Sequence, residues 1–191
     1  EVSTDTDRPQ LVYELAPPPN TLSNVADAFV RGGTYANNNY GTNTQLVVKD
    51  NAGSADNDRM SFLKFDLSTV TGTVASAKIR LKVQNDDPGA SHQLHFVSDD
   101  SWTETGITWN NQPSTGALIG TETVPAIGEW IEFEVTSQVN GELFGDGTLS
   151  VRVSESSIGT YAVYHAREVS TAEDRPQLVY ELAPQANSLS N

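Results

Sequence analysis

The sequence predicts an all-β protein, an antiparallel two-sheet β-sandwich of the jelly-roll type. Apolar and polar residues alternate with a period of two along most of the chain, while helical periodicity is almost absent. Clusters of Gly, Asn, Asp and Pro separate the alternating runs and indicate turns. About ten short strands, each with one polar face, need a second sheet to cover their apolar sides. A jelly roll is the topology that we expect.

Individual strands follow from the same alternation. Along residues 77–83, Ala, Ile, Leu and Val alternate with two Lys and one Arg. Comparable alternation covers residues 62–67, 130–135, 149–154 and 177–182. Further strands are predicted at residues 26–31, 44–49, 92–98, 105–109 and 160–166. One helical turn is predicted within residues 136–144.

Composition excludes several classes of function. The 191 residues include 11 Lys plus Arg against 25 Asp plus Glu, so the net charge of −14 disfavours nucleic-acid binding. No apolar run reaches the ~20 residues that span a bilayer, so we expect no membrane insertion. The absence of Cys excludes disulfides and thiol chemistry. An acidic chain rich in Thr, Asn and Gly suits an extracellular or cell-surface protein.

An internal repeat indicates a tandem array. Residues 168–191 repeat residues 1–24 with 19 identical positions. We therefore divide the chain into the final strand of a preceding unit (1–16), a Pro/Asn-rich linker (17–24), a complete unit (25–183) and the start of the next linker (184–191). In this interpretation an inter-unit contact is made by Gln10, Leu11, Val12, Tyr13, Glu14 and Leu15. Alternatively, residues 10–15 add as a strand to a neighbouring subunit and build a filament.

Several segments carry a family resemblance. They are ADAFVRGGTYANNNYGTNTQLVVK (26–49), DRMSFLKFDLS (58–68), SWTETGITWNNQP (101–113) and EWIEFEVT (129–136). In this order they resemble the DNRLRE domain, which is related to carbohydrate-binding modules found with alginate lyases. The resemblance implies a β-jelly roll in an extracellular setting, frequent occurrence in repetitive surface proteins, and no catalysis.

Cations and aromatic rings provide candidate carbohydrate-binding residues. If the strands that carry these cations are neighbours, an acidic protein has a basic face that can bind a polyuronate by charge-assisted hydrogen bonds. The alternatives are that these cations limit aggregation, or that they pair with Glu132 and Glu134 across strands. The candidates are Arg31, Lys49, Arg59, Lys64, Arg80, Lys82, Tyr40 and Trp130. Tyr35 and Trp102 are further platforms for a sugar ring, whereas Trp109 is expected in the core.

No cofactor is required by the sequence, although oxygen-rich loops are compatible with a structural Ca²⁺. The candidate ligands are Asp27, Asn39, Asp56 and Asp58, and ordinary turn chemistry is the alternative explanation for the loop residues. His92 and His95 are predicted on opposite faces of a strand, so they cannot bind one metal ion together. Glu132 and Glu134 share a polar strand face, where no apolar pocket is expected to raise a pKa for catalysis.

These observations favour a non-catalytic extracellular tandem-repeat module of an adhesin, stalk or filament, with neighbouring copies as partners. The alternative is a carbohydrate-binding module for an anionic polysaccharide such as alginate. A filament subunit joined by strand addition through residues 10–15 is the third hypothesis.

Overall fold

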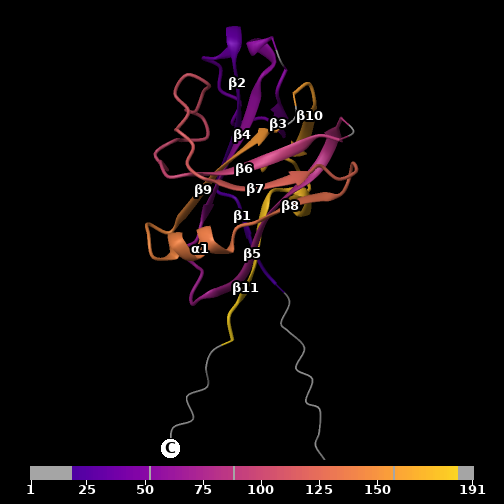
Figure 1. The fold of residues 1–191 in the computed structure, drawn as a ribbon. Helices are drawn as coiled ribbons and strands as arrows, with labels where there is room; N and C mark the ends of the chain where they lie inside the picture. Colours follow the sequence, from indigo (N-terminus) through magenta and orange to yellow (C-terminus); the bar gives the residue numbers. More distant parts are fainter. Residues whose placement is uncertain (1–18, 52, 88, 157, 185–191) are drawn as a thin grey trace, which may run out of the picture.

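The protein is an all-β fold in the computed structural model, which describes residues 19–184 except 52, 88 and 157 (Figure 1). Within these residues, eleven strands and one short α-helix occur, and every strand pair is antiparallel. The strands are β1 (Asn20–Ser23), β2 (Ala26–Arg31), β3 (Gln45–Lys49), β4 (Arg59–Asp66), β5 (Val74–Asp86), β6 (Ser91–Val97), β7 (Leu118–Thr123), β8 (Trp130–Glu134), β9 (Thr148–Glu155), β10 (Tyr161–His165) and β11 (Gln177–Leu182). The helix is α1 (Thr136–Leu143).

The strands form a curled antiparallel sheet. One group follows the order β1-β11-β5-β8, and another follows β2-β4-β9-β6-β7. Strand β5 pairs with β8 through Lys78–Lys82 and with β10 near its end. Strand β10 pairs with β3, and β3 pairs with β4, so these strands connect the two groups. One continuous path of hydrogen-bonded strands therefore connects the whole fold. The all-β antiparallel class is confirmed, while the two-sheet jelly-roll topology stays a prediction.

The period-two alternation places apolar side chains in the core. Along β5, Ala77, Ile79, Leu81 and Val83 are buried and join the larger core cluster. Strand β4 is covered on both sides: Leu63 and Phe65 belong to the larger cluster, whereas Phe62 belongs to a smaller one. That smaller cluster also contains Trp102 and Ile107 from a long loop. The loop between β6 and β7 is thus anchored to the sheet by apolar packing.

The structure differs from the predicted strands in three places: residues 105–109 are not a strand, and β1 and β7 were not predicted. Residues 105–109 form turns rather than a strand, because the backbone amide groups of Gly106 and Ile107 both bond to the carbonyl of Thr103. Apolar residues of this loop face the smaller cluster, so apolar and polar residues alternate along it as they do in a strand. Strand β7 was not predicted, since it is mostly exposed and lacks an apolar face. The predicted helical turn is confirmed by α1.

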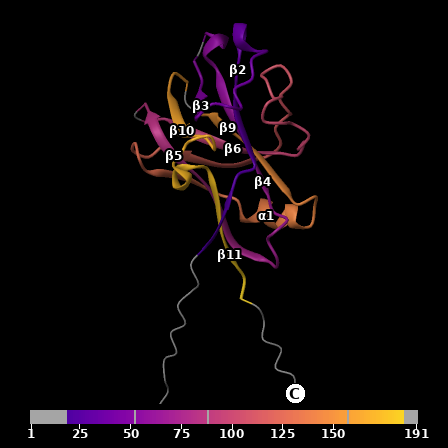
Figure 2. The ribbon, with the colours of Figure 1, turned by 180° about the vertical axis from the view of Figure 1, so that it is seen from behind.

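Strand β1 closes the fold by pairing with β11, so the first and last strands of the described chain are neighbours (Figures 1 and 2). The range 17–24, which we expected to be a linker, therefore contains a strand. The proposed inter-unit residues 10–15 lie outside the described residues. Within the described part of the chain, no helix has the length and apolar character needed to cross a membrane.

Candidate functional site

The expected basic face is divided between two surfaces, because the strands that carry the cations are not all neighbours. Arg80 and Lys82 lie on β5 and Trp130 on β8, and Lys82 is directly opposite Trp130. The remaining cations of the predicted set lie on β2, β3 and β4. The condition for one continuous basic face, that all these strands are neighbours, is therefore not met, since β10 and β3 lie between β5 and β4.

On the first surface, formed by β11, β5 and β8, the cations are already paired. Lys82 Nζ lies 2.5 Å from Asp174 Oδ1, and Lys78 Nζ lies 2.9 Å from Glu132 Oε2. Arg80 donates to Gln177 Oε1 at 2.9 and 2.5 Å. Two hollows of about 470 and 390 Å³ adjoin this surface, and both are lined by Lys78 and Glu132. Pairing with nearby side chains thus accounts for much of this charge.

Trp130 is partly exposed, as predicted, and lies close to two cations of this surface. The Arg80 guanidinium carbon is 4.6 Å from the centre of the Trp130 ring, and Lys82 Nζ is 5.9 Å from it. These cation–π contacts help to fix the position of the Trp130 ring. This surface therefore has a partly exposed indole ring beside cations that are already paired.

The second surface carries a row of three cations. Arg31 on β2 is directly opposite Arg59 on β4, and Arg59 is directly opposite Lys49 on β3. Directly opposite residues of antiparallel strands point to the same side of the sheet. We call Arg31, Arg59 and Lys49 the cation row. Lys49 is in turn opposite Tyr161 on β10.

Two tyrosines flank the cation row. The Arg31 guanidinium carbon lies 3.5 Å from the centre of the Tyr35 ring, and Lys49 Nζ lies 5.6 Å from that of Tyr161. Tyr35 is an exposed aromatic residue with 37% of its surface accessible. The row therefore combines positive charge with flat apolar rings at the surface, which is a combination that suits an acidic sugar.

Among the described residues, the cation row has no carboxylate partner. In the described residues, no carboxylate oxygen lies within 4.0 Å of a side-chain nitrogen of Arg31, Arg59 or Lys49. Instead, Arg31 Nε donates to the carbonyl of Asp56 at 2.7 Å and Arg59 Nη1 to that of Asn57 at 2.8 Å. Burial and the charge of Arg31 lower the pKa of Arg59. Like charges in direct opposition are unfavourable, and a bound anion would relieve them.

Three other candidate carbohydrate-binding residues, Lys64, Trp102 and Tyr40, make contacts within the protein instead. Lys64 Nζ donates to the carbonyls of Asp100 and Trp102 at 2.6 and 2.7 Å and lies over the Trp102 ring. Trp102 is buried, and Tyr40 stacks on Phe29 with ring centres 4.3 Å apart. These side chains stabilise the loops that cover β2 and β4. Trp109, expected in the core, packs partly buried against the smaller cluster.

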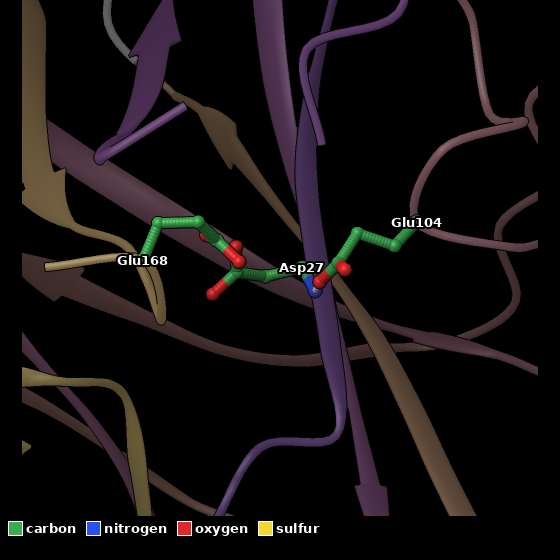
Figure 3. A group of neighbouring side chains, drawn as sticks. All are labelled: Asp27, Glu104 and Glu168. Atoms are coloured by element: carbon green, nitrogen blue, oxygen red, sulfur yellow. Dashed lines mark hydrogen bonds between the residues drawn. The ribbon is translucent and has the colours of Figure 1, made fainter. Parts of the chain in front are cut away.

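A different group of charges gathers beside β2. Asp27, Glu104 and Glu168 each place a carboxylate oxygen within 4.8 Å of the others, and Figure 3 shows Glu104 and Glu168 converging on Asp27. We call these three residues the carboxylate cluster. Asp27 is only 1% exposed. Its Oδ2 accepts from Asn24 Nδ2 at 2.6 Å and from the backbone amide of Arg167 at 2.9 Å.

Glu104 holds the cluster to its surroundings. Its Oε1 accepts the backbone amide of Asp27 at 3.0 Å, and Arg167 Nη1 lies 3.1 Å from each of its oxygens. Burial raises the pKa of Asp27 to about 7, opposed by the hydrogen bonds from Arg167 and Asn24 and reinforced by the charges of Glu168 and Glu104. Burial, followed by the charge of Glu104, also raises the pKa of Glu168.

Of the four candidate Ca²⁺ ligands, only Asp27 belongs to this cluster. Asp56 Oδ1 accepts the amide of Thr34, and Asp58 Oδ1 accepts the amide of Asn51 at 3.0 Å. Asn39 uses its Nδ2 to donate to the carbonyls of Glu104 and Ile107, at 2.8 and 2.7 Å. Asp56, Asp58 and Asn39 thus make the hydrogen bonds of turns and loops, which is the alternative to Ca²⁺ binding given above.

Glu104 and Glu168 were not predicted as site residues, because they are far from Asp27 along the chain and no local spacing connects them. The two histidines behave as predicted. His92 is fully buried against Tyr164 and Glu155, whereas His95 is partly exposed and bonds to Gln93.

Comparisons with known proteins identify the family. The family model of carbohydrate-binding module family 96 matches residues 18–181. A gellan lyase of Bacillus sp is 32% identical over 167 residues, which is 82% of this chain and 6% of that enzyme. The chain thus spans a small part of this curated relative. The predicted relationship to carbohydrate-binding modules is confirmed: the chain belongs to carbohydrate-binding module family 96.

Proposed function

We propose that this chain is a non-catalytic extracellular module that binds an anionic polysaccharide through the cation row, with Tyr35 and Tyr161 beside it. The observation that carries the proposal is the alignment of three cations on adjacent strands, with no carboxylate partner in the part of the chain that the structure describes. Family membership now favours this function over the adhesin or stalk that the sequence alone favoured.

The chemistry of the row suits a uronic acid polymer. Arg guanidinium groups bind a sugar carboxylate by charge-assisted hydrogen bonds, and Lys adds a point charge. The exposed Tyr35 ring offers a flat surface for the apolar side of a sugar ring. With a net charge of −14, most of the protein surface repels an anionic polymer, so we expect binding at those described cations that have no carboxylate partner.

Binding to alginate and gellan should be measured by isothermal titration calorimetry at low and high salt. We expect Arg59→Ala to weaken binding roughly tenfold to a hundredfold, the value of one or two lost hydrogen bonds to a charged group. Arg31→Ala should act in the same direction, and high salt should weaken binding by the wild type.

Lys78→Ala provides the matched control, because it removes one positive charge from the other surface, where Lys78 is paired with Glu132. It should bind both polymers as the wild type does. Loss of binding in Lys78→Ala or Trp130→Ala, with Arg59→Ala unaffected, would move the site to the β5–β8 surface. If the chain binds neither polymer at low salt, the proposed function in binding anionic polysaccharides is wrong.

The absence of catalysis is part of this proposal. The carboxyl with a pKa near neutrality, Asp27, is 1% exposed and cannot reach a polymer. Glu132 is paired with Lys78. We expect no unsaturated or reducing product when alginate or gellan is incubated with the chain, and measurable turnover would contradict the proposal.

A second candidate role, compatible with the first, is that of a repeated unit in a surface protein. The 19 identical positions between residues 1–24 and 168–191 favour it. Repetition would give weak binding sites avidity for a long polymer. The sequence of the parent gene tests this role: further copies at the same spacing are expected, and their absence would remove it together with the proposed unit boundaries, leaving strand addition through residues 10–15 as the alternative.

A further inference from the structure

The carboxylate cluster has an excess of negative charge, and it includes the buried Asp27 beside two partly exposed glutamates. Asp27 comes from β2, Glu104 from the loop after β6, and Glu168 from the segment after β10. When all three are ionised, Arg167 is the one cation of the described residues that is bonded to them, and the group then keeps two negative charges. Burying such charge is costly unless a counter-charge is supplied.

Unpaired oxygens at the same place provide an independent observation. Asn24 is 4% exposed and its amide lies against the cluster, with Nδ2 donating to Asp27. Oδ1 of the same amide is buried without a hydrogen-bond partner, and so is Oε2 of Glu168. Buried acceptors without donors are rare in native proteins and usually indicate a missing ligand, ion or water.

We propose that Asp27, Glu104 and Glu168, together with Asn24 Oδ1, bind a divalent cation, and that this cation is Ca²⁺. The site offers only oxygen donors, which excludes a preference for the softer metals that favour nitrogen or sulfur. Carboxylates mixed with an amide oxygen, in irregular loop geometry, suit Ca²⁺ better than Mg²⁺, which demands a near-ideal octahedron. The two positive charges of Ca²⁺ balance the two negative charges that remain on the cluster after its pairing with Arg167.

The site would join three segments that are distant in the sequence. It fastens the start of β2 to the loop that carries Glu104 and to the chain after β10. Arg167, whose side chain is 36% exposed, can turn toward solvent when the cation engages Glu104. The cluster and the cation row are separate residue sets, so failure of one proposal leaves the other standing.

The test is calorimetric titration of the dialysed full chain with CaCl₂ alone, together with thermal unfolding in Ca²⁺, Mg²⁺ or EDTA. We expect one saturable site, a higher Tm with Ca²⁺ than with Mg²⁺, and the lowest Tm with EDTA. Glu168→Gln, which keeps the shape of a partly exposed side chain, should weaken Ca²⁺ binding by on the order of tenfold or more. Asp27→Asn should do the same.

Glu134→Gln is the matched control, since Glu134 is an exposed glutamate on β8 and should leave Ca²⁺ binding unchanged. The proposal is overturned if the wild type shows neither heat nor a Tm shift up to ~10 mM Ca²⁺, well above the ~1 mM affinity of weak extracellular sites. Binding by Glu168→Gln equal to the wild type would also overturn it, even if Asp27→Asn does not fold. An equal response to Mg²⁺ would overturn the assignment to Ca²⁺.

Discussion

Carboxylates of this protein respond to their immediate surroundings in opposite ways. Asp66 and Asp99 are exposed, and each accepts hydrogen bonds from the serine two positions later, which lower its pKa. Asp100 and Glu142 are partly buried, and burial followed by the charge of Asp146 raises the pKa of both. Acidic residues that look alike in the sequence therefore stabilise the fold in some places and oppose it in others.

Asp146→Asn should make the protein less sensitive to rising pH. The folded pKa values of Asp100 and Glu142 are raised, so the folded state binds more protons than the unfolded state just above about pH 4, and stability falls as the pH rises through those pKa values. Removing the charge of Asp146 reduces this loss. Asn keeps the oxygen that accepts the amide of Thr148 at 2.9 Å. Urea unfolding at about pH 4 and pH 7 measures the difference.

Asp66→Asn is the control of opposite sign. The lowered pKa of Asp66 contributes stability above its unfolded pKa, so this variant should lose stability at neutral pH relative to acid. If Asp146→Asn loses as much stability between about pH 4 and pH 7 as the wild type does, charge crowding around Asp100 and Glu142 is not the cause.

At the scale of elements, α1 is fastened to β5 by one amide side chain. Asn140 Oδ1 accepts the backbone amide of Val74 at 3.0 Å, and Asn140 Nδ2 donates to the carbonyl of Val74 at 2.9 Å. The side chain thus imitates a neighbouring strand at the start of β5. Val139 of the same helix is fully buried in the larger core cluster. Polar and apolar contacts together fix the position of α1.

Asn140→Asp should lower the free energy of unfolding by about 1–3 kcal/mol, the cost of leaving a partly buried polar group unpaired. The carboxylate can still accept from the amide of Val74, but it cannot donate to the carbonyl. Denaturant unfolding near neutral pH measures the change. Ser137→Ala, at an exposed position of the same helix, should stay within about 0.5 kcal/mol of the wild type. Equal stability of the two variants would argue against this role of Asn140.

For the molecule as a whole, closure depends on the pairing of β1 with β11. The paired residues run from Asn20 opposite Tyr180 to Ser23 opposite Gln177. Leu22 of β1 packs against the larger core cluster. A short N-terminal strand therefore covers the edge of β11, which would otherwise present unpaired backbone groups to other molecules.

A chain of residues 19–184 is the reference for this test, because it contains every described element. A chain of residues 24–184 lacks β1 and should lose at least about 2 kcal/mol, from the burial of Leu22 and the strand hydrogen bonds. Thermal unfolding and light scattering compare the chains. A Tm for residues 24–184 equal to that of the longer chain would show that β1 contributes no stability.

Much of the fold could be predicted because strand alternation is a local property. Residues 77–83 alternate between the core and the surface whichever strands lie beside them, so β5 was predicted well. Strands β1 and β7 were not predicted, because they are short or exposed and bury little apolar surface. Residues 105–109 were misassigned since a loop anchored by Ile107 shows the same alternation as a strand.

The amino-acid sequence alone determined the all-β class, the acidic charge, the repeat and the individual cations, because these depend on composition and on neighbours along the chain. Only the tertiary structure decided which cations lie together and which acids converge. Strand pairing brings Arg59 between Arg31 and Lys49, whereas the loop after β6 and the segment after β10 bring Glu104 and Glu168 to Asp27. Such long-range contacts depend on strand order and register, which no local pattern specifies.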